Sequence, residues 1–125
     1  MNEIIKILIV EDSEDDVILM THYIKQKCVN MEYTWVDSKS KLISQLELDI
    51  KWDLAICDNN LPQLTGSEAI SLIEEKSHNT PVICVSGSTI DGSYKNCLKA
   101  GAIAFIEKKN LEELVNVVIE ILAKK

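Results

Sequence analysis

Short apolar runs recur along the chain at fairly even spacing. The five runs are Ile4–Val10, Glu32–Val36, Asp53–Cys57, Pro81–Ser86 and Ile103–Ile106. Most of them are continuously apolar rather than alternating, which is typical of strands that are buried on both faces of a sheet. The pattern therefore predicts five buried strands.

The segments that follow these runs show the spacing of amphipathic helices. Ser13 with Asp16 offers a capping box for the first helix, Ser40 precedes the second, Gly66 opens the third, Asn110 precedes the last, and Gly101 is a natural C-terminal cap for the fourth. The positions that mark the five helices are Val17, Met20, Ile24 and Cys28; Leu42, Leu46 and Ile50; Ala69, Ile70 and Ile73; a segment from roughly Asp91 to Ala100; and Leu111, Leu114, Val115, Val118 and Leu122.

Predicted strands and helices alternate throughout the sequence with short connections. This alternation implies a parallel sheet with helices on both faces. The 125 residues suit one domain, and we find no internal repeat, low-complexity stretch or linker. The sequence therefore predicts a single α/β domain over residues 1–125.

Composition narrows the possible environments and partners. Hydrophobic residues make up 46% of the chain and charged residues 26%, an ordinary balance for a globular protein. No apolar run approaches the ~20 residues that a membrane helix needs, and the first residues do not form a signal peptide. We therefore expect a cytoplasmic protein without membrane contact.

Charge and cysteine content exclude two further classes of site. The net charge is -7, and all 13 basic residues are lysines, so the chain lacks the arginine fork favoured for reading guanine. Direct nucleic-acid binding is therefore not expected. The four cysteines contain no CxxC pair, and we interpret them as buried hydrophobic residues rather than as zinc or redox sites. They are Cys28, Cys57, Cys84 and Cys97.

Polar residues gather where the predicted strands end. In open α/β sheets, functional groups collect at the carboxyl ends of the strands. The residues at these ends are Glu11 and Asp12 after the first run, Asp58 with Asn59 and Asn60 after the third, Ser86 at the end of the fourth, and Lys108 shortly after the fifth. Three carboxylates, one hydroxyl and one ammonium are thus expected to meet at one edge of the sheet.

Crowded carboxylates either raise a pKa or hold a hard cation. Oxygen ligands without imidazole or thiolate favour Mg²⁺. With a metal and Lys108 to neutralise developing charge, Asp58 would be a nucleophile for covalent phosphoryl transfer. A simpler interpretation is open for some of these residues, because acids at 14–16 suit a helix N-terminus and the DNNLP segment resembles a turn.

Four segments of the chain resemble the response-regulator receiver family of two-component signalling. They are KILIVEDSEDDVILM, LAICDNNLPQLTG with its Pro62 and Gly66, PVICVSGST, and KAGAIAFIEK. The resemblance covers essentially the whole chain. It implies a flavodoxin-like, doubly wound five-stranded sheet in the order 2-1-3-4-5 with five helices.

The resemblance also implies roles for individual residues in a two-component phosphorelay. Asp58 would accept a phosphoryl group from a phosphohistidine of a sensor histidine kinase or histidine phosphotransfer protein. Asp12 and Asp58 would bind Mg²⁺ (or Mn²⁺) by their side chains, Glu11 through water and Asn60 through its backbone carbonyl. The remaining roles fall to Lys108 and Ser86, which would contact the phosphoryl group; to Phe105, which would act with Ser86 as the switch; and to Asn60 and Ser88, which would tune dephosphorylation.

Such a domain is not an enzyme beyond its own phosphorylation and dephosphorylation. It would signal to a downstream protein by changing conformation, as a monomer or a phosphorylation-dependent dimer. We expect the change on the face formed by the fourth helix, fifth strand and fifth helix.

Two positions depart from the family pattern. Lys109 follows the lysine where the family usually has proline, often through a cis peptide, and a cis bond to another residue type costs about 3 kcal/mol. The family's geometry for this loop therefore does not carry over by resemblance alone. Phe105 replaces the more frequent tyrosine and can change position by packing but cannot make a polar contact.

Three other functions compete with this interpretation. A hydrolase with an aspartate nucleophile needs a second carboxylate two residues later, where this chain has Asn60. A flavin-binding protein needs a hydroxyl-rich phosphate loop, whereas EDSEDD would repel a phosphate. The remaining alternative is a degenerate receiver that acts as a phosphorylation-independent interaction module.

Overall fold

The computed structural model describes residues 3–77, 79–87 and 94–124. Within these residues, parallel strands form one five-stranded sheet in the order β2-β1-β3-β6-β7. The strands are β1 (Ile5–Val10), β2 (Met31–Val36), β3 (Leu54–Asp58), β6 (Val82–Ser86) and β7 (Ala104–Glu107). The predicted order 2-1-3-4-5 is confirmed, because these are the first to fifth long strands of the chain.

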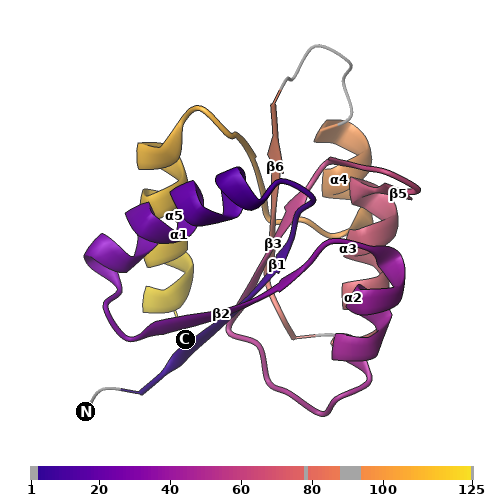
Figure 1. The fold of residues 1–125 in the computed structure, drawn as a ribbon, viewed down its shortest axis with the longest axis horizontal. Coiled ribbons are helices and arrows are strands. Elements are labelled where there is room, and N and C mark those ends of the chain that lie inside the picture. The colour runs from indigo at the N-terminus through magenta and orange to yellow at the C-terminus, as the bar shows by residue number, and fades with distance from the viewer. Residues whose placement is uncertain (1–2, 78, 88–93, 125) are drawn as a thin grey trace.

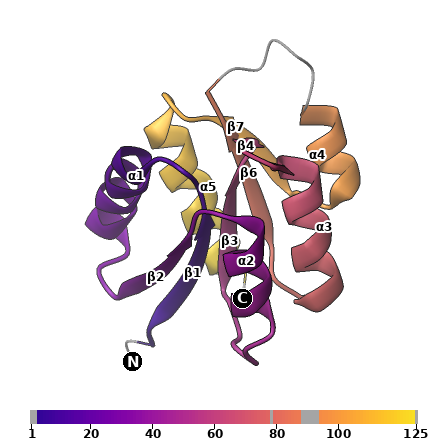
Figure 2. The same ribbon diagram turned by 45° about the vertical axis from the view of Figure 1, so that its right-hand side comes forward.

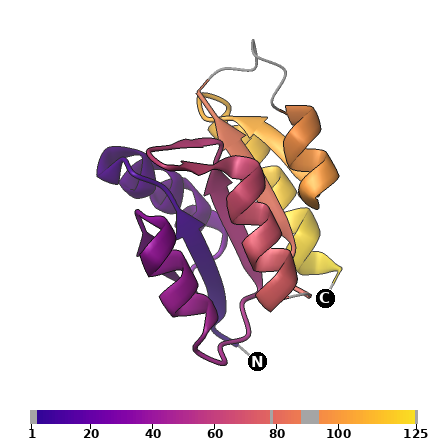
Figure 3. The same ribbon diagram turned by 90° about the vertical axis from the view of Figure 1, so that its right-hand side faces the viewer.

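Helices cover both faces of the sheet. Figure 1 shows α1 (Glu14–Lys27) and α5 (Leu111–Ala123) on one side, and α2 (Lys39–Leu46), α3 (Gly66–Lys76) and α4 (Tyr94–Ala100) on the other. The view turned by 45° shows the same two layers, and the view turned by 90° faces the three-helix side (Figures 2 and 3). The protein is therefore a doubly wound α/β fold.

Each face of the sheet has its own hydrophobic core. In β1, the alternating side chains Ile7 and Ile9 join the core beneath α1 and α5, whereas Leu8 and Val10 join the core on the other side. All four side chains have no exposed surface. Burial on both faces is the physical reason why the strands are continuously apolar in sequence.

The helix boundaries follow the sequence with three local corrections. The Ser13 side chain caps α1, but the Asp16 carboxylate does not complete the expected capping box, because Ser13 N–H donates to Glu11 Oε2 at 3.2 Å. A complete box forms instead at α3, between Thr65 and Glu68. The second helix begins after Ser38 rather than Ser40 and ends before Ile50.

The fourth helix is described from Tyr94 onward, and its expected start at Asp91 lies outside the described residues. Gly101 follows this helix with a φ of +125°, as expected of a glycine cap.

A short antiparallel pair follows the third long strand and was not predicted. It consists of β4 (Asn60–Leu61) and β5 (Leu64–Thr65), joined by Pro62 and Gln63. Gln63 has a φ of +62°, the conformation that a type II turn requires at the position after proline. This pair fixes the segment directly after Asp58.

Two expectations about the interior and the membrane can be compared with the structure. The four cysteines are buried, and none of them, all within the described residues, forms a disulfide. Among the described helices, none combines the length and the apolar character that crossing a membrane requires.

Candidate functional site

The acidic residues predicted at the strand ends meet at the carboxyl edge of the sheet. Strands β1 and β3 are neighbours, with Val10 paired to Cys57, so Glu11 and Asp58 come side by side. One carboxylate oxygen from each of Glu11, Asp12 and Asp58 lies within 4.8 Å of the others. Glu11 has no exposed surface and Asp58 is 4% exposed, whereas Asp12 is exposed. The cluster therefore has a buried base and an open side.

Lys108 supplies the positive charge in this cluster. Its Nζ lies 2.8 Å from Glu11 Oε1, 3.1 Å from Asp58 Oδ2 and 2.8 Å from Asp16 Oδ2. Its backbone N–H donates to the Ser86 carbonyl at 2.8 Å, which attaches the loop to the end of β6. No described peptide bond is cis, so the lysine reaches the carboxylates through a trans bond to Lys109.

Glu11 is held from several directions. Its Oε2 accepts from the backbone N–H groups of Asp12 at 3.1 Å and Ser13 at 3.2 Å, and its carbonyl accepts from Trp35 Nε1 at 2.6 Å. The pKa of Glu11 is raised from its ordinary 4.5 to about 7: burial is the main cause, Asp58 also raises the pKa, and the contact with Lys108 partly offsets both. Near neutral pH, the Glu11 carboxyl group is therefore divided between its protonated and its charged form.

The charge of Lys108 is stabilised by its neighbours. Burial lowers the pKa of this ammonium, but the contacts with Asp16 and Glu11 and the nearby charge of Asp58 outweigh it, so the pKa is raised overall. Lys108 is therefore a permanent cation at neutral pH.

The Asp58 carboxylate is oriented by contacts at both oxygens. Oδ1 accepts from the Asn60 backbone N–H at 3.2 Å, and Oδ2 accepts from Lys108. The next backbone N–H, that of Asn59, donates to the Val85 carbonyl at 2.8 Å. These contacts place the carboxylate at the point where β3 gives way to the β4–β5 pair.

The carboxylate cluster has the chemistry of a site for a hard divalent cation. Its donors are oxygens only, which suits Mg²⁺ or Mn²⁺ better than softer metals. Glu11 Oε1 is buried and has no hydrogen-bond partner among the described residues, although it forms an ion pair with Lys108. A buried, incompletely satisfied carboxylate oxygen beside two other carboxylates is what a hydrated cation would complete.

The other predicted site residues lie around this centre. Ser86 is buried at the end of β6, beside β3, and Asn60 is exposed on β4. Phe105 is partly buried in β7, and its ring packs edge-on against Tyr94 of α4, with centroids 6.1 Å apart and planes at 62°. Ser88 lies outside the described residues.

Two contacts of the site cannot be predicted from the sequence. The acidic residues 14–16 suit a helix N-terminus, yet Asp16 also contacts Lys108, which is 92 positions away in the sequence. Trp35 carried no signal beyond being an aromatic residue near a strand end, where an indole N–H usually finds a hydrogen-bond partner. Both contacts join elements that are distant in sequence.

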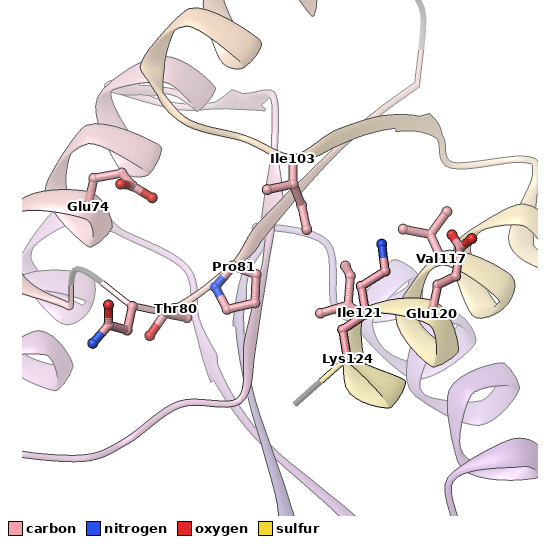
Figure 4. Close-up of a pocket in the computed structure, with 9 residues that line it drawn as sticks. Glu74, Thr80, Pro81, Ile103, Val117, Glu120, Ile121 and Lys124 are labelled. Carbon is pink, nitrogen blue, oxygen red and sulfur yellow. The ribbon is translucent and has the colours of Figure 1, made fainter.

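A groove in the described part of the chain lies at the opposite end of the sheet. Its volume is about 650 Å³, and Figure 4 shows Pro81 and Ile103, just before β6 and β7, facing Val117 and Ile121 of α5. These positions precede strands, whereas the carboxylate cluster follows strands. The groove is therefore separate from the site.

The fold and the carboxylates at the strand ends are those of a receiver module. A family model for the response regulator receiver domain matches residues 7–119. The chain belongs to this family.

Similar structures and relatives agree with the assignment. A CheY-like receiver domain from Methanospirillum hungatei is 23% identical, with a TM-score of 0.85 over 98% of this chain and 96% of that one. The receiver domain of sensor histidine kinase PA1611 from Pseudomonas aeruginosa, which has a magnesium ion in its active-site cleft, is 22% identical, with a TM-score of 0.81 over 97% of this chain and 99% of that one. The two-component response regulator ARR16 of Arabidopsis thaliana is 27% identical over 120 residues, covering 86% of this chain and 73% of that protein.

Other relatives are much longer than this chain. The protein-glutamate methylesterase/protein-glutamine glutaminase of Archaeoglobus fulgidus is 29% identical over 123 residues, which are 95% of this chain but 34% of that protein. The matched region of the autoinducer 2 sensor kinase/phosphatase LuxQ of Vibrio vulnificus is 12% of its length. The receiver module is therefore shared among proteins of different overall architecture.

Proposed function

We propose that this chain, residues 1–125, is a receiver domain in which Asp58 accepts a phosphoryl group from a phosphohistidine. The donor would be a sensor histidine kinase or a histidine phosphotransfer protein. An oxygen of the Asp58 carboxylate attacks phosphorus, the phosphorus–nitrogen bond to the imidazole breaks, and an acyl phosphate forms as the imidazole leaves with the electron pair. The observation that carries the proposal is the buried Asp58 carboxylate bonded to Lys108 beside Glu11 and Asp12.

The residues around Asp58 would either orient its carboxylate or bind the phosphoryl group. The Asn60 N–H and Lys108 orient the carboxylate in the resting state, so little reorganisation precedes attack. Lys108 then donates to a phosphoryl oxygen, and Ser86, at the end of the neighbouring strand, donates to another. Both act as fixed charge or dipole at the place where negative charge develops.

Magnesium, or manganese, would be held by Asp12 and Asp58 directly, by Glu11 through water and by the Asn60 carbonyl. When bound, the ion would neutralise the charge on the transferring group. Support comes from the oxygen-only donors and the incompletely satisfied Glu11 Oε1. Asn60 and Ser88 would set the lifetime of the phospho-aspartate.

The partner that delivers the phosphoryl group needs a surface on which to dock beside the site. Helix α1 begins directly after the Glu11–Asp12 pair and exposes two large apolar side chains, Ile18 at 56% and Leu19 at 46%. Adjacent exposed apolar residues on one helix are typical of a protein interface. Their place on the helix that follows the Glu11–Asp12 pair supports docking of the phosphodonor protein there.

The output would pass through Phe105. If Ser86 moves toward the phosphoryl group, Phe105 can move inward, and its edge-on contact with Tyr94 then has to change. The effect would reach α4, β7 and α5 and alter the affinity for a downstream protein. Unchanged amide exchange on this face after activation would contradict the switch.

The proposed phosphorylation can be tested by intact mass. The protein is incubated with Mg²⁺ and acetyl phosphate beside Asp58→Asn, which keeps the shape of the side chain but lacks the nucleophilic carboxylate. We expect one added phosphoryl group on the wild type, none without metal and none on the variant. Beryllofluoride, which mimics the phosphoryl group, is titrated in parallel. Its binding would reveal a competent site even if the phosphoryl adduct hydrolyses too quickly to be seen by mass. If neither reagent gives a response, the chain acts as a phosphorylation-independent interaction module instead.

A further inference from the structure

The contact between Asp16 and Lys108 is not explained by the roles given so far. Asp16 Oδ2 lies 2.8 Å from Lys108 Nζ, closer than the 3.1 Å between Lys108 and Asp58 Oδ2. Asp16 does not belong to the three-carboxylate cluster that could hold a cation. Among the described residues, the ion pair with Lys108 is what joins the Asp16 side chain to the site.

A helix-dipole explanation accounts for the acidic turn but not for this contact. Glu14, Asp15 and Asp16 all lie in the first turn of α1, where negative charge is favourable. Of these three described residues, only Asp16 forms an ion pair. The Ser13 cap positions it, because Ser13 Oγ accepts from Asp16 N–H at 3.3 Å while the carboxylate points to the lysine.

The ammonium group of Lys108 has three N–H donors and three carboxylate neighbours. A phosphoryl group on Asp58 would need one of these donors and a share of the positive charge. The contacts with Glu11 and Asp58 lie inside the cluster, where the phosphoryl group would form, whereas the contact with Asp16 lies outside it.

We propose that Asp16 is a positioning residue that holds Lys108 toward α1 and so restrains phosphorylation of Asp58. The proposal rests on the proposed function. Its physical basis is twofold: Asp16 keeps one lysine donor occupied, and its charge repels an anionic phosphodonor that approaches the same ammonium.

The test compares four proteins: the wild type, Asp16→Asn, Asp16→Glu and Asp15→Asn. The last variant removes the same charge from the same helical turn but from an exposed residue without an ion pair, so it is the matched control. The rate of phosphorylation by acetyl phosphate is followed by intact mass, and the affinity for beryllofluoride by fluorescence. Thermal unfolding of each variant monitors the helix itself.

We expect Asp16→Asn to be phosphorylated about 3- to 10-fold faster than the wild type, the change that one nearby unit charge produces at this range. Its affinity for beryllofluoride should rise in the same direction. Asp15→Asn should stay within about twofold of the wild type, since an exposed charge is largely screened. Asp16→Glu restores the charge and should return the rate toward that of the wild type. Salt should reduce the difference between the wild type and Asp16→Asn.

Two results would overturn the inference while leaving the proposed function intact. One is a phosphorylated wild type with equal rates for Asp16→Asn and Asp15→Asn, which would show a general charge effect only. The other is a slower Asp16→Asn, which would show that the carboxylate assists the reaction. If no protein of the set gains mass or binds beryllofluoride, the proposed function fails and this inference fails with it.

Discussion

Glu11 has no exposed surface, and its neighbours act in opposite directions on the ionisation of its carboxyl group. Two backbone N–H groups and Lys108 favour its charged form, whereas burial and Asp58 favour its neutral form. Unpaired buried charge is expensive, so the nearby Lys108 ammonium is what stabilises the charged form of Glu11. Proton binding at Glu11 and cation binding at the cluster should therefore compete.

This competition predicts a pH-dependent affinity for Mg²⁺. The pKa of Glu11 is raised to about 7, so the carboxyl group is mostly protonated below that pH and mostly charged above it. Because a metal favours the charged form, affinity should rise with pH by up to about tenfold per unit below pH 7 and level off above it. Calorimetric titration from pH 5.5 to 8.5 measures this curve.

Glu11→Gln is the control for that titration. The amide cannot titrate, so the variant should bind Mg²⁺ more weakly and show a flat profile across pH 6 to 8. A wild-type profile that is equally flat would contradict the assignment of the transition to Glu11.

The residues of the site differ in how far sequence could identify them. Asp58, Glu11 and Lys108 could be predicted because each lies at or just after the end of a strand, and parallel strands bring their carboxyl ends together. The role of Asp16 could not be predicted, because Ser13 and Asp16 match the local pattern of a capping box. In that pattern the Asp16 carboxylate would accept from the Ser13 N–H rather than contact a distant lysine. Its partner Lys108 is 92 positions away, and only the folded chain shows that Glu11 Oε2 takes the Ser13 N–H instead.

At the scale of elements, the start of α3 approaches the residue after Asp58 very closely. A Cβ added at Gly66 would lie 2.8 Å from Asn59 Oδ1, 2.9 Å from Asn59 Cα and 3.2 Å from Cys97 Sγ. Cys97 itself, on α4, donates to Asn59 Oδ1 at 3.2 Å. The loop after β3 is therefore packed between α3 and α4, and glycine is needed for space rather than for a special backbone angle.

This close approach predicts that Gly66→Ala is destabilising. One of the atoms that the methyl group would meet belongs to the backbone and cannot rotate away, so we expect a loss of about 1–3 kcal/mol in the free energy of unfolding. Urea denaturation measures it. Gly87→Ala is the matched control, because a Cβ there would meet no atom of the described residues within 4 Å, and its stability should be nearly unchanged. Equal stability of the two variants would contradict the packing argument.

Sequence predicted the long elements better than the short ones. Five continuously apolar runs identify the strands because both faces of the sheet are covered. The β4–β5 pair has two residues per strand, too few for a hydrophobic period, so it could not be distinguished from a turn. Its effect on the site is direct, since the Asn60 N–H that orients Asp58 belongs to it.

At the scale of the whole molecule, the parallel sheet separates two ends with different surfaces. The carboxylate cluster lies where strands end, and the apolar groove of Figure 4 lies where β6 and β7 begin. The five residues of β3 alone span about 17 Å between these ends. A ligand bound at the carboxylate cluster would therefore make no direct contact with side chains at the opposite end of the sheet.

The two tryptophans lie on opposite sides of this separation. Trp35 donates to the Glu11 carbonyl at the site, whereas Trp52 is buried just before β3 begins. In Trp52→Phe, where Trp35 is the remaining tryptophan, Mg²⁺ or beryllofluoride should change the fluorescence. In Trp35→Phe it should not, because Trp52 is about a strand length from the ligand. Calorimetry on Trp35→Phe serves as the control: it tests whether this variant still binds Mg²⁺, so that an unchanged fluorescence is not mistaken for lost binding. An equal response of both reporters would mean that ligand binding rearranges the sheet from end to end, rather than the edge that carries the carboxylates.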